Sequence, residues 1–294
     1  MIGRTLFALT FIAAARLVAQ SASAGKIEAH TVFDSTYRRS RQVWVYTPAG
    51  YDAKATTPYP LIIAFDGDEY RDTMPLPMVL DTLLATRKTP AFVAVLIDNG
   101  EGAVPIADLG NAPRMADFLA KQLVPWVRKG WRVTTDPTRV IITGSSAGGL
   151  AASYVAFVHP QLFGNVWSQS GAIWRGADGS NGAPYEWLTA QVKAAPPKPV
   201  RYVLDVGALE DHATLGGAGP NFLDASRRFR DALRGQGLRR HLHRSSRRQP
   251  RTPMVENAAG RWHRSAQCRL VESLGTAGVT TFRTANATTL DQPL

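Results

Sequence analysis

The pentapeptide Gly144–Gly148, with Ser146 at its centre, constrains the fold of this chain more than any other feature. It reads Gly-Ser-Ser-Ala-Gly and fits the pattern G-x-S-x-G. Residues 139–143 before it predict a strand, because they are largely β-branched, and the small residues 149–156 after it predict a helix. A serine in a tight turn between a strand and a helix is exposed above the sheet, where it can act as a nucleophile. The alternative is an ordinary Gly/Ser turn; Ser145 does not fit the spacing.

The backbone beside Ser146 predicts part of a site for a developing negative charge. The N–H group of Ala147 lies at the start of the predicted helix, where backbone donors have no intrahelical acceptor. We therefore expect this N–H group to stabilise the oxyanion that forms when a serine attacks a carbonyl carbon.

Strands and helices alternate along the rest of the chain. A hairpin is predicted over residues 27–49, strands at 60–65, 91–97, 163–169 and 201–206, and helices at 74–86, 115–129 and 222–233. This alternation predicts an α/β fold with three layers, in which helices cover both faces of a mostly parallel central sheet. One domain over residues 25–237 is long enough to bury such a core.

Residues 1–24 read as a signal peptide rather than as part of this domain. Arg4 gives a positive start, residues 5–15 are mostly apolar, and Ala22-Ser23-Ala24 is an A-x-A cleavage site. We expect export to the periplasm or secretion, with the mature chain starting near Gly25. The alternative is a buried N-terminal helix, and no other segment is long and apolar enough to span a bilayer.

The net charge of +11 is concentrated near the C-terminus. Residues 239–294 hold 10 arginines and 3 acidic residues, a surplus of +7. This terminal segment says little about partners of the folded part, so we expect no nucleic-acid partner; an arm for nucleic acid or an anionic surface is the weaker alternative. The single cysteine, Cys268, excludes an internal disulfide and argues against a cysteine-based metal site. We expect neither cofactor nor metal, and the oligomeric state stays open.

Several stretches together carry a family resemblance. They are residues 41–48 with Gly50-Tyr51, 65–67, 95–98, 123–127, the pentapeptide with Gly149-Leu150, 168–171, and 204–207 with Glu210. Over residues 27–237 the chain resembles the enterochelin-esterase-like hydrolases, an α/β-hydrolase branch related to esterase D and the feruloyl esterases. The resemblance implies an α/β-hydrolase fold and a serine esterase of the short, exported form. Its small-molecule substrate would be a siderophore-like, aryl or sugar-linked ester.

The resemblance also implies roles for particular residues. Ser146 would be the nucleophile, and the acid of the triad would be Glu210, with Asp211 as the second choice. A loop acid exposed to solvent is the alternative for Glu210. The second oxyanion donor would come from Gly67 or Asp68, where a plain turn is the alternative.

Two aromatic residues are candidates for a substrate pocket. Trp174 and Tyr185 follow the strand predicted at 163–169 and could line an apolar acyl or aryl site; core or surface packing is the alternative. The sequence also departs from siderophore-cleaving members, which carry an arginine two residues before an acidic-Leu pair. Here the pair is Asp108-Leu109, and Pro105 is near the expected position. This departure argues against a catecholate substrate.

The histidine that should complete the triad is missing from its expected place. In this fold it follows the last strand, which should come after Gly237. Residues 238–250 show neither strand nor helix spacing and are rich in arginine. His212 lies beside the acid, and solvent-exposed side chains are the simpler reading of His241, His243 and His263. His30 and His159 precede the acid and read as structural.

We hypothesise that residues 238–294 are an atypical, Arg-rich tail read out of frame. Codons for residues 241–252 can be chosen so that a one-base shift reads an alternating strand followed by Gly-Gly-Asn-His. On this hypothesis the last strand and helix are lost or disordered. The leading function is then a serine esterase, and the alternative is an impaired or inactive relative that keeps the fold.

Overall fold

The computed structural model describes residues 24–98, 100, 108–110, 112–176, 183–211 and 221–236, together with the strand at 281–285. The signal-peptide prediction for residues 1–24 falls almost wholly outside the described residues, and so does the tail except for that strand. None of the helices in the described ranges is long and apolar enough to cross a membrane.

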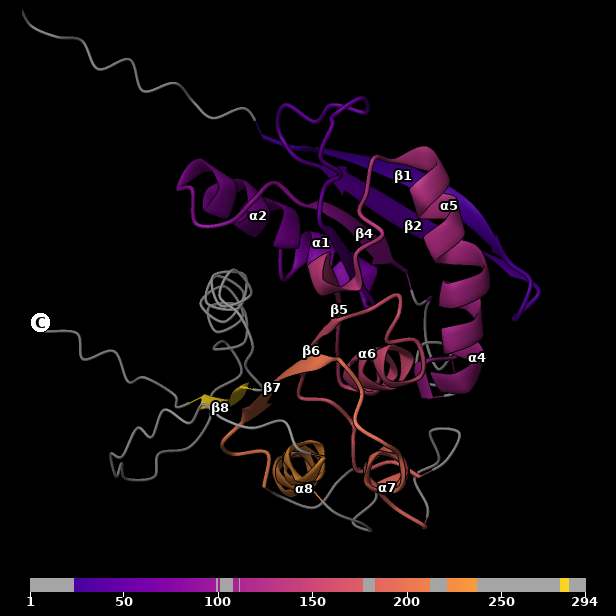
Figure 1. Ribbon diagram of the computed structural model, residues 1–294, viewed down its shortest axis with the longest axis vertical. Coiled ribbons are helices and arrows are strands. Elements are labelled where there is room, and N and C mark those ends of the chain that lie inside the picture. The colour runs from indigo at the N-terminus through magenta and orange to yellow at the C-terminus, as the bar shows by residue number, and fades with distance from the viewer. Residues whose placement is uncertain are drawn as a thin grey trace, which may run out of the picture.

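One eight-stranded sheet organises the molecule (Figure 1). Its strands are β1 (Lys26–Asp34), β2 (Arg39–Thr47), β3 (Leu61–Ala64), β4 (Val93–Ile97), β5 (Val140–Ser145), β6 (Asn165–Gln169), β7 (Arg201–Gly207) and β8 (Thr281–Ala285). Their spatial order is β1-β2-β4-β3-β5-β6-β7-β8. The predicted hairpin, β1 with β2, is antiparallel and joins β4 antiparallel, whereas all later pairs are parallel. The predicted mostly parallel α/β-hydrolase sheet is confirmed.

Helices cover both faces of this sheet. They are α1 (Gly67–Asp72), α2 (Leu76–Ala85), α4 (Ala112–Phe118), α5 (Val124–Gly130), α6 (Ala147–Val158), α7 (Trp187–Ala194) and α8 (Phe222–Gly235). Alternate residues of one strand face opposite sides, as pleating requires. In β3, Leu61 and Ile63 join the core cluster under α4, α5, α6, α7 and α8, while Ile62 and Ala64 join the cluster under α1 and α2. The predicted three layers follow from this alternation.

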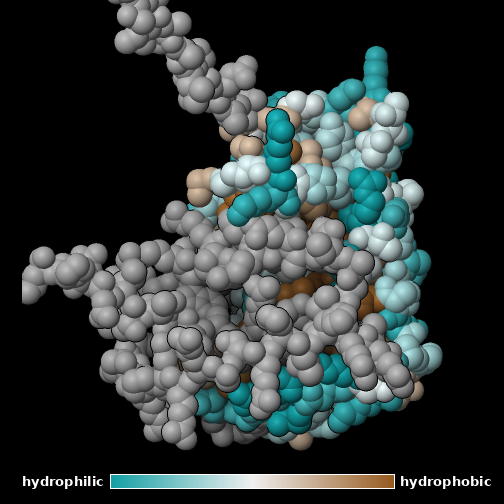
Figure 2. All heavy atoms as spheres, turned by 60° about the vertical axis from the view of Figure 1, so that its left-hand side comes forward, coloured by the Kyte–Doolittle hydropathy of each residue, from teal (hydrophilic) through white to brown (hydrophobic). Residues whose placement is uncertain are grey.

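The surface is consistent with this placement of the apolar residues. In Figure 2 the described part of the visible face is mostly hydrophilic, and apolar residues show mainly near its middle. The β3 and β4 side chains, which are continuously apolar in the sequence, are buried on both sides of the sheet.

The predicted helix at 115–129 is interrupted. A π-helical turn, Leu119–Leu123, lies between α4 and α5. Pro125 in the first turn of α5 lacks the N–H group that would continue the α-helical ladder. The wider turn before it accommodates this missing donor.

One strand of the sheet, β8, lies in the C-terminal tail and was not predicted from the sequence. Thr281–Ala285 pairs in parallel with β7, with Val203 opposite Thr281 and Gly207 opposite Ala285. The segment reads Thr-Phe-Arg-Thr-Ala, in which β-branched and aromatic residues favour extended backbone. The edge of β7 offers unpaired N–H and C=O groups that such a strand can satisfy. The prediction that the last strand and helix of the fold are lost or disordered concerns the residues that directly follow Gly237, and these lie outside the described residues.

Candidate active site

Ser146 occupies a strained turn between β5 and α6. Its backbone φ and ψ are 50° and −114°, a conformation that costs a non-glycine residue about 1–3 kcal/mol. Two backbone hydrogen bonds hold it: Ser146 N–H donates to the carbonyl of Gln169 at 2.9 Å, and Ala172 N–H donates to the carbonyl of Ser146 at 2.8 Å. The side chain is exposed while Ala147 and Gly148 beside it are buried. The strand, turn and helix therefore have the predicted arrangement.

Two glycines allow this turn to close. A Cβ atom on Gly144 would lie 2.6 Å from the carbonyl carbon of Gly148, and one on Gly148 would lie 2.3 Å from Oδ2 of Asp66. The first of these contacts is with backbone, which cannot rotate away. The G-x-S-x-G pattern thus reflects close packing of α6 on the end of β5.

Replacing Gly144 with Ala should lower stability by about 1–3 kcal/mol, because the turn must open to admit the methyl group. Urea unfolding measures the change. Gly235→Ala in α8 is the matched control, since its Cβ would meet nothing within 4 Å. Equal stabilities of the two variants would contradict the close-packing argument.

Asp66 links the end of β3 to this turn. It has a left-handed backbone with φ 56°, and its Oδ2 accepts a hydrogen bond from Ser145 N–H at 2.8 Å. Gly67 begins α1, where a Cβ would lie 2.7 Å from the backbone of Ile97. The first-turn N–H groups of Gly67 and Asp68 lack intrahelical acceptors, as does that of Ala147 in α6. Residues 66–68 are thus the start of a helix rather than a plain turn.

The buried Tyr70 hydroxyl, which the sequence did not predict as part of the site, contacts the segments next to the Ser146 turn. The Tyr70 hydroxyl hydrogen-bonds with Oε1 of Gln169 and lies 3.3 Å from Oγ1 of Thr143. Burial raises the pKa of Tyr70 far above its ordinary value, so the hydroxyl stays protonated as a donor. Because the Gln169 carbonyl accepts from Ser146, this contact braces the candidate nucleophile.

Glu210 lies just past β7, as predicted for the triad acid. Its Oε1 accepts a hydrogen bond from the Ser170 hydroxyl at 2.7 Å. Oε2 is buried and has no hydrogen-bond partner among the described residues. Burial raises the pKa of Glu210, and the bond from Ser170 partly offsets this rise. Asp211, the second choice, is exposed.

The described histidines lie away from Ser146. His159 follows α6, whose 12 residues at about 1.5 Å each separate it from Ser146 by roughly 18 Å. His30 in β1 packs edge-on against Trp126 and Trp131, with ring centroids 5.6 and 5.1 Å away. Neither is placed to act as a base for Ser146, and their structural role stays a prediction. The other four, His212, His241, His243 and His263, lie outside the described residues.

The two aromatic pocket candidates differ in burial. Trp174 is 2% exposed and packs edge-on against Phe222, with centroids 6.0 Å apart, so it contributes to the core. Tyr185 is partly exposed ahead of α7. Their contact with a substrate stays a prediction.

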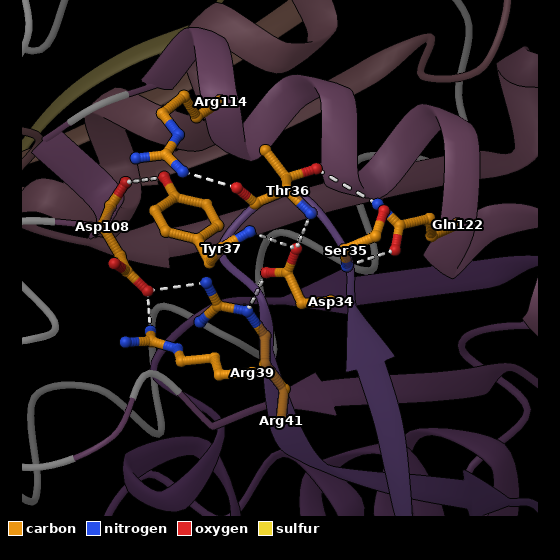
Figure 3. A network of polar contacts seen from close by, with 9 residues as sticks. All are labelled: Asp34, Ser35, Thr36, Tyr37, Arg39, Arg41, Asp108, Arg114 and Gln122. Atoms are coloured by element: carbon orange, nitrogen blue, oxygen red, sulfur yellow. Dashed lines mark hydrogen bonds and ion pairs between the residues drawn. The ribbon is translucent and has the colours of Figure 1, made fainter.

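A buried ionic network joins Asp108 to the β1–β2 hairpin (Figure 3). Arg41 donates to Oδ2 of Asp34 and to Oδ2 of Asp108, at 2.6 Å each, and Arg39 also pairs with Asp108. The Tyr37 hydroxyl donates to the Asp108 carbonyl at 3.0 Å. The network ties residues 108–110 to the β1–β2 hairpin, and sequence spacing gave no signal for it.

Sequence comparison finds curated relatives that are longer than this chain. The iron(III) enterobactin esterase of Escherichia coli K12 is 32% identical over 179 residues, which cover 59% of this chain and 42% of that protein. The enzyme of the same name from Dickeya dadantii is 32% identical over 134 residues, covering 46% and 30%. The chain thus matches less than half the length of these relatives.

Structure comparison and a family model agree with this similarity. Enterochelin esterase from Shigella flexneri superposes with a TM-score of 0.61 at 25% identity, covering 71% of this chain and 50% of that one. A ferulic acid esterase shares the fold at 18% identity, with a TM-score of 0.58 and 73% and 87% coverage. The family model Esterase, described as "Putative esterase", matches residues 35–248. Since that match spans most of the chain and includes the Ser146 turn, the chain belongs to the Esterase family.

Proposed function

We propose that this protein is a serine carboxylic-ester hydrolase with Ser146 as its nucleophile. The observation that carries the proposal is the exposed Ser146 hydroxyl on a strained turn at the N-terminus of α6. Oγ of Ser146 forms a bond to the ester carbonyl carbon, and the alcohol leaves with the serine proton. Water then attacks the acyl-enzyme, releasing the carboxylic acid and returning a proton to Ser146.

The remaining groups follow from the surroundings of Ser146. The N–H of Ala147, with that of Gly67 or Asp68, would hold the oxyanion. Glu210 would be the acid, because it is half-buried beside the turn and keeps one carboxylate oxygen unpartnered among the described residues. The base would be a histidine outside the described residues.

The positions of the described histidines favour a second candidate function, that of an inactive relative. His30 and His159, the histidines in the described ranges, do not reach Ser146. This favours an impaired or inactive relative, a pseudoenzyme or a frameshifted product that keeps the fold. Without a base the serine hydroxyl stays protonated and is a poor nucleophile.

The substrate class and location complete the proposal. The curated relatives are named for iron(III) enterobactin and a structural neighbour for ferulic acid, which supports a siderophore-like, aryl or sugar-linked ester. Of the two aromatic candidates, Tyr185 would face its acyl or aryl part, because it is partly exposed whereas Trp174 is buried. The charged start, apolar run and A-x-A site of residues 1–24 support export and cleavage before Gly25.

A fluorophosphonate probe tests the nucleophile directly. It phosphonylates activated serines, so we expect an adduct on the peptide containing Ser146 that mass spectrometry locates. Ser145→Ala should still react, because its hydroxyl does not fit the turn, whereas Ser146→Ala should not. A folded protein that stays unlabelled would overturn the proposal in favour of the inactive relative.

A further inference from the structure

We propose that Ser170 is a positioning residue for catalysis, whose hydroxyl holds the Glu210 carboxylate in the orientation that a triad base needs. The inference rests on the proposed function, since it assigns Glu210 the role of the acid. It concerns a residue that touches neither substrate nor the reacting atoms and acts through Glu210 alone.

The first support is that one short segment of chain forms hydrogen bonds with both Ser146 and Glu210. Residues Gln169 and Ala172, on either side of Ser170, bind the backbone of Ser146 at 2.9 and 2.8 Å. The Ser170 hydroxyl donates to Oε1 of Glu210 at 2.7 Å. One short segment after β6 therefore fixes both the candidate nucleophile and the candidate acid.

The second support is the difference between the two oxygens of the Glu210 carboxylate. Oε1 is occupied by Ser170, while Oε2 is buried without a hydrogen-bond partner in the described part of the chain. A buried carboxylate oxygen without a donor is costly. An imidazole N–H, the partner of the acid in a serine triad, would satisfy it. Ser170 thus fixes the carboxylate by one oxygen and leaves the other for the base.

The third support is the backbone of Ser170 itself. Its φ is 42°, in the left-handed region where glycine is favoured, and its N–H donates to the Asp205 carbonyl at 2.7 Å. A glycine would adopt this conformation with less strain. A glycine would lack the side-chain hydroxyl, which here donates a hydrogen bond to Glu210.

Two substitutions separate the hydroxyl from the backbone strain. Ser170→Ala keeps the strain and removes the donor; Ser170→Gly removes both. With p-nitrophenyl butyrate as substrate, both should lower kcat by about 10–100-fold with little change in KM, because the acid is misplaced rather than lost. Ser170→Gly should melt at the same temperature as the unaltered chain or higher. The combination of higher stability with lower kcat is not expected of a purely structural residue.

A double-variant cycle tests whether Ser170 acts through Glu210. In a Glu210→Gln background, Ser170→Ala should lower kcat no further, since the group it orients is already altered. Additive losses would overturn the inference, and so would an unchanged kcat in Ser170→Ala.

A pH series of urea unfolding checks the bond without activity. The Ser170 hydroxyl favours the ionised form of the Glu210 carboxylate. Ser170→Ala should therefore lower the free energy of unfolding little at about pH 4 and more near pH 7, after Glu210 ionises. A difference that does not change with pH would contradict the assignment. If the unaltered chain shows no Ser146-dependent turnover, the proposed function fails and this inference fails with it. Ser146-dependent turnover whose kcat is unchanged in Ser170→Ala overturns only the inference.

Discussion

Ser146→Ala should lower kcat for p-nitrophenyl butyrate by a factor on the order of 10⁴–10⁶. The alanine fits the turn, because it removes only the hydroxyl and keeps the Cβ atom. The backbone bonds to Gln169 and Ala172 do not involve the side chain, so binding of the ester should change little. Release of nitrophenolate, followed with enzyme in excess over one turnover, measures the loss.

The neighbouring serine provides the matched control. Ser145 bonds to Asp66 through its backbone N–H, which Ser145→Ala leaves intact, and kcat should stay within a few-fold. Equal slow hydrolysis by the unaltered chain and by Ser146→Ala would show that Ser146 is not the nucleophile. That outcome would support the inactive relative as the function of this chain.

Arg41→Met should destabilise the fold by about 3–5 kcal/mol, the cost typical of breaking a buried ion pair from one side. The Arg41 side chain is 1% exposed and Asp34, its partner, is 0% exposed. Methionine fills similar volume but leaves Asp34 without its guanidinium. Asp108 keeps Arg39. Urea unfolding at pH 7 measures the change in the free energy of unfolding.

Arg39→Met is the control for this prediction. Arg39 binds the same Asp108 but is 34% exposed, so water can replace its contact, and we expect a loss of about 1 kcal/mol or less. Equal losses in the two variants would show that burial of Arg41 does not determine the effect. A loss below about 1 kcal/mol in Arg41→Met would contradict the prediction outright.

Much of the fold was predictable because it depends on local patterns. The continuous apolar runs of β3 and β4 and the small residues of α6 can be recognised in the sequence without knowledge of distant residues. The π-helical turn before Pro125 depends on a single missing donor, and the pairing of β8 with β7 joins residues more than 70 positions apart. Long-range pairing has no signal in hydrophobic period, so that strand was not predicted.

The candidate site likewise has a part that local sequence patterns predict and a part that depends on contacts between distant residues. The Ser146 turn was predictable from glycine spacing, since close backbone packing admits no other residue at Gly144. The contacts of Tyr70 with Gln169 and of Ser170 with Glu210 join residues from different strands, and each of these residues is common in its type of segment. A sequence pattern records a residue but not which distant side chain it contacts.

The contacts that hold the Ser146 turn come from the two strands that flank β5. Asp66 follows β3, and residues 169–172 lie at the end of β6 and just after it. All of these contacts lie before residue 237, within the stretch the family model matches. The backbone contacts that hold the candidate nucleophile are thus encoded upstream of residue 237, whereas the proposed base lies outside the described residues. Changes confined to the sequence after residue 237 would leave these contacts of Ser146 in place.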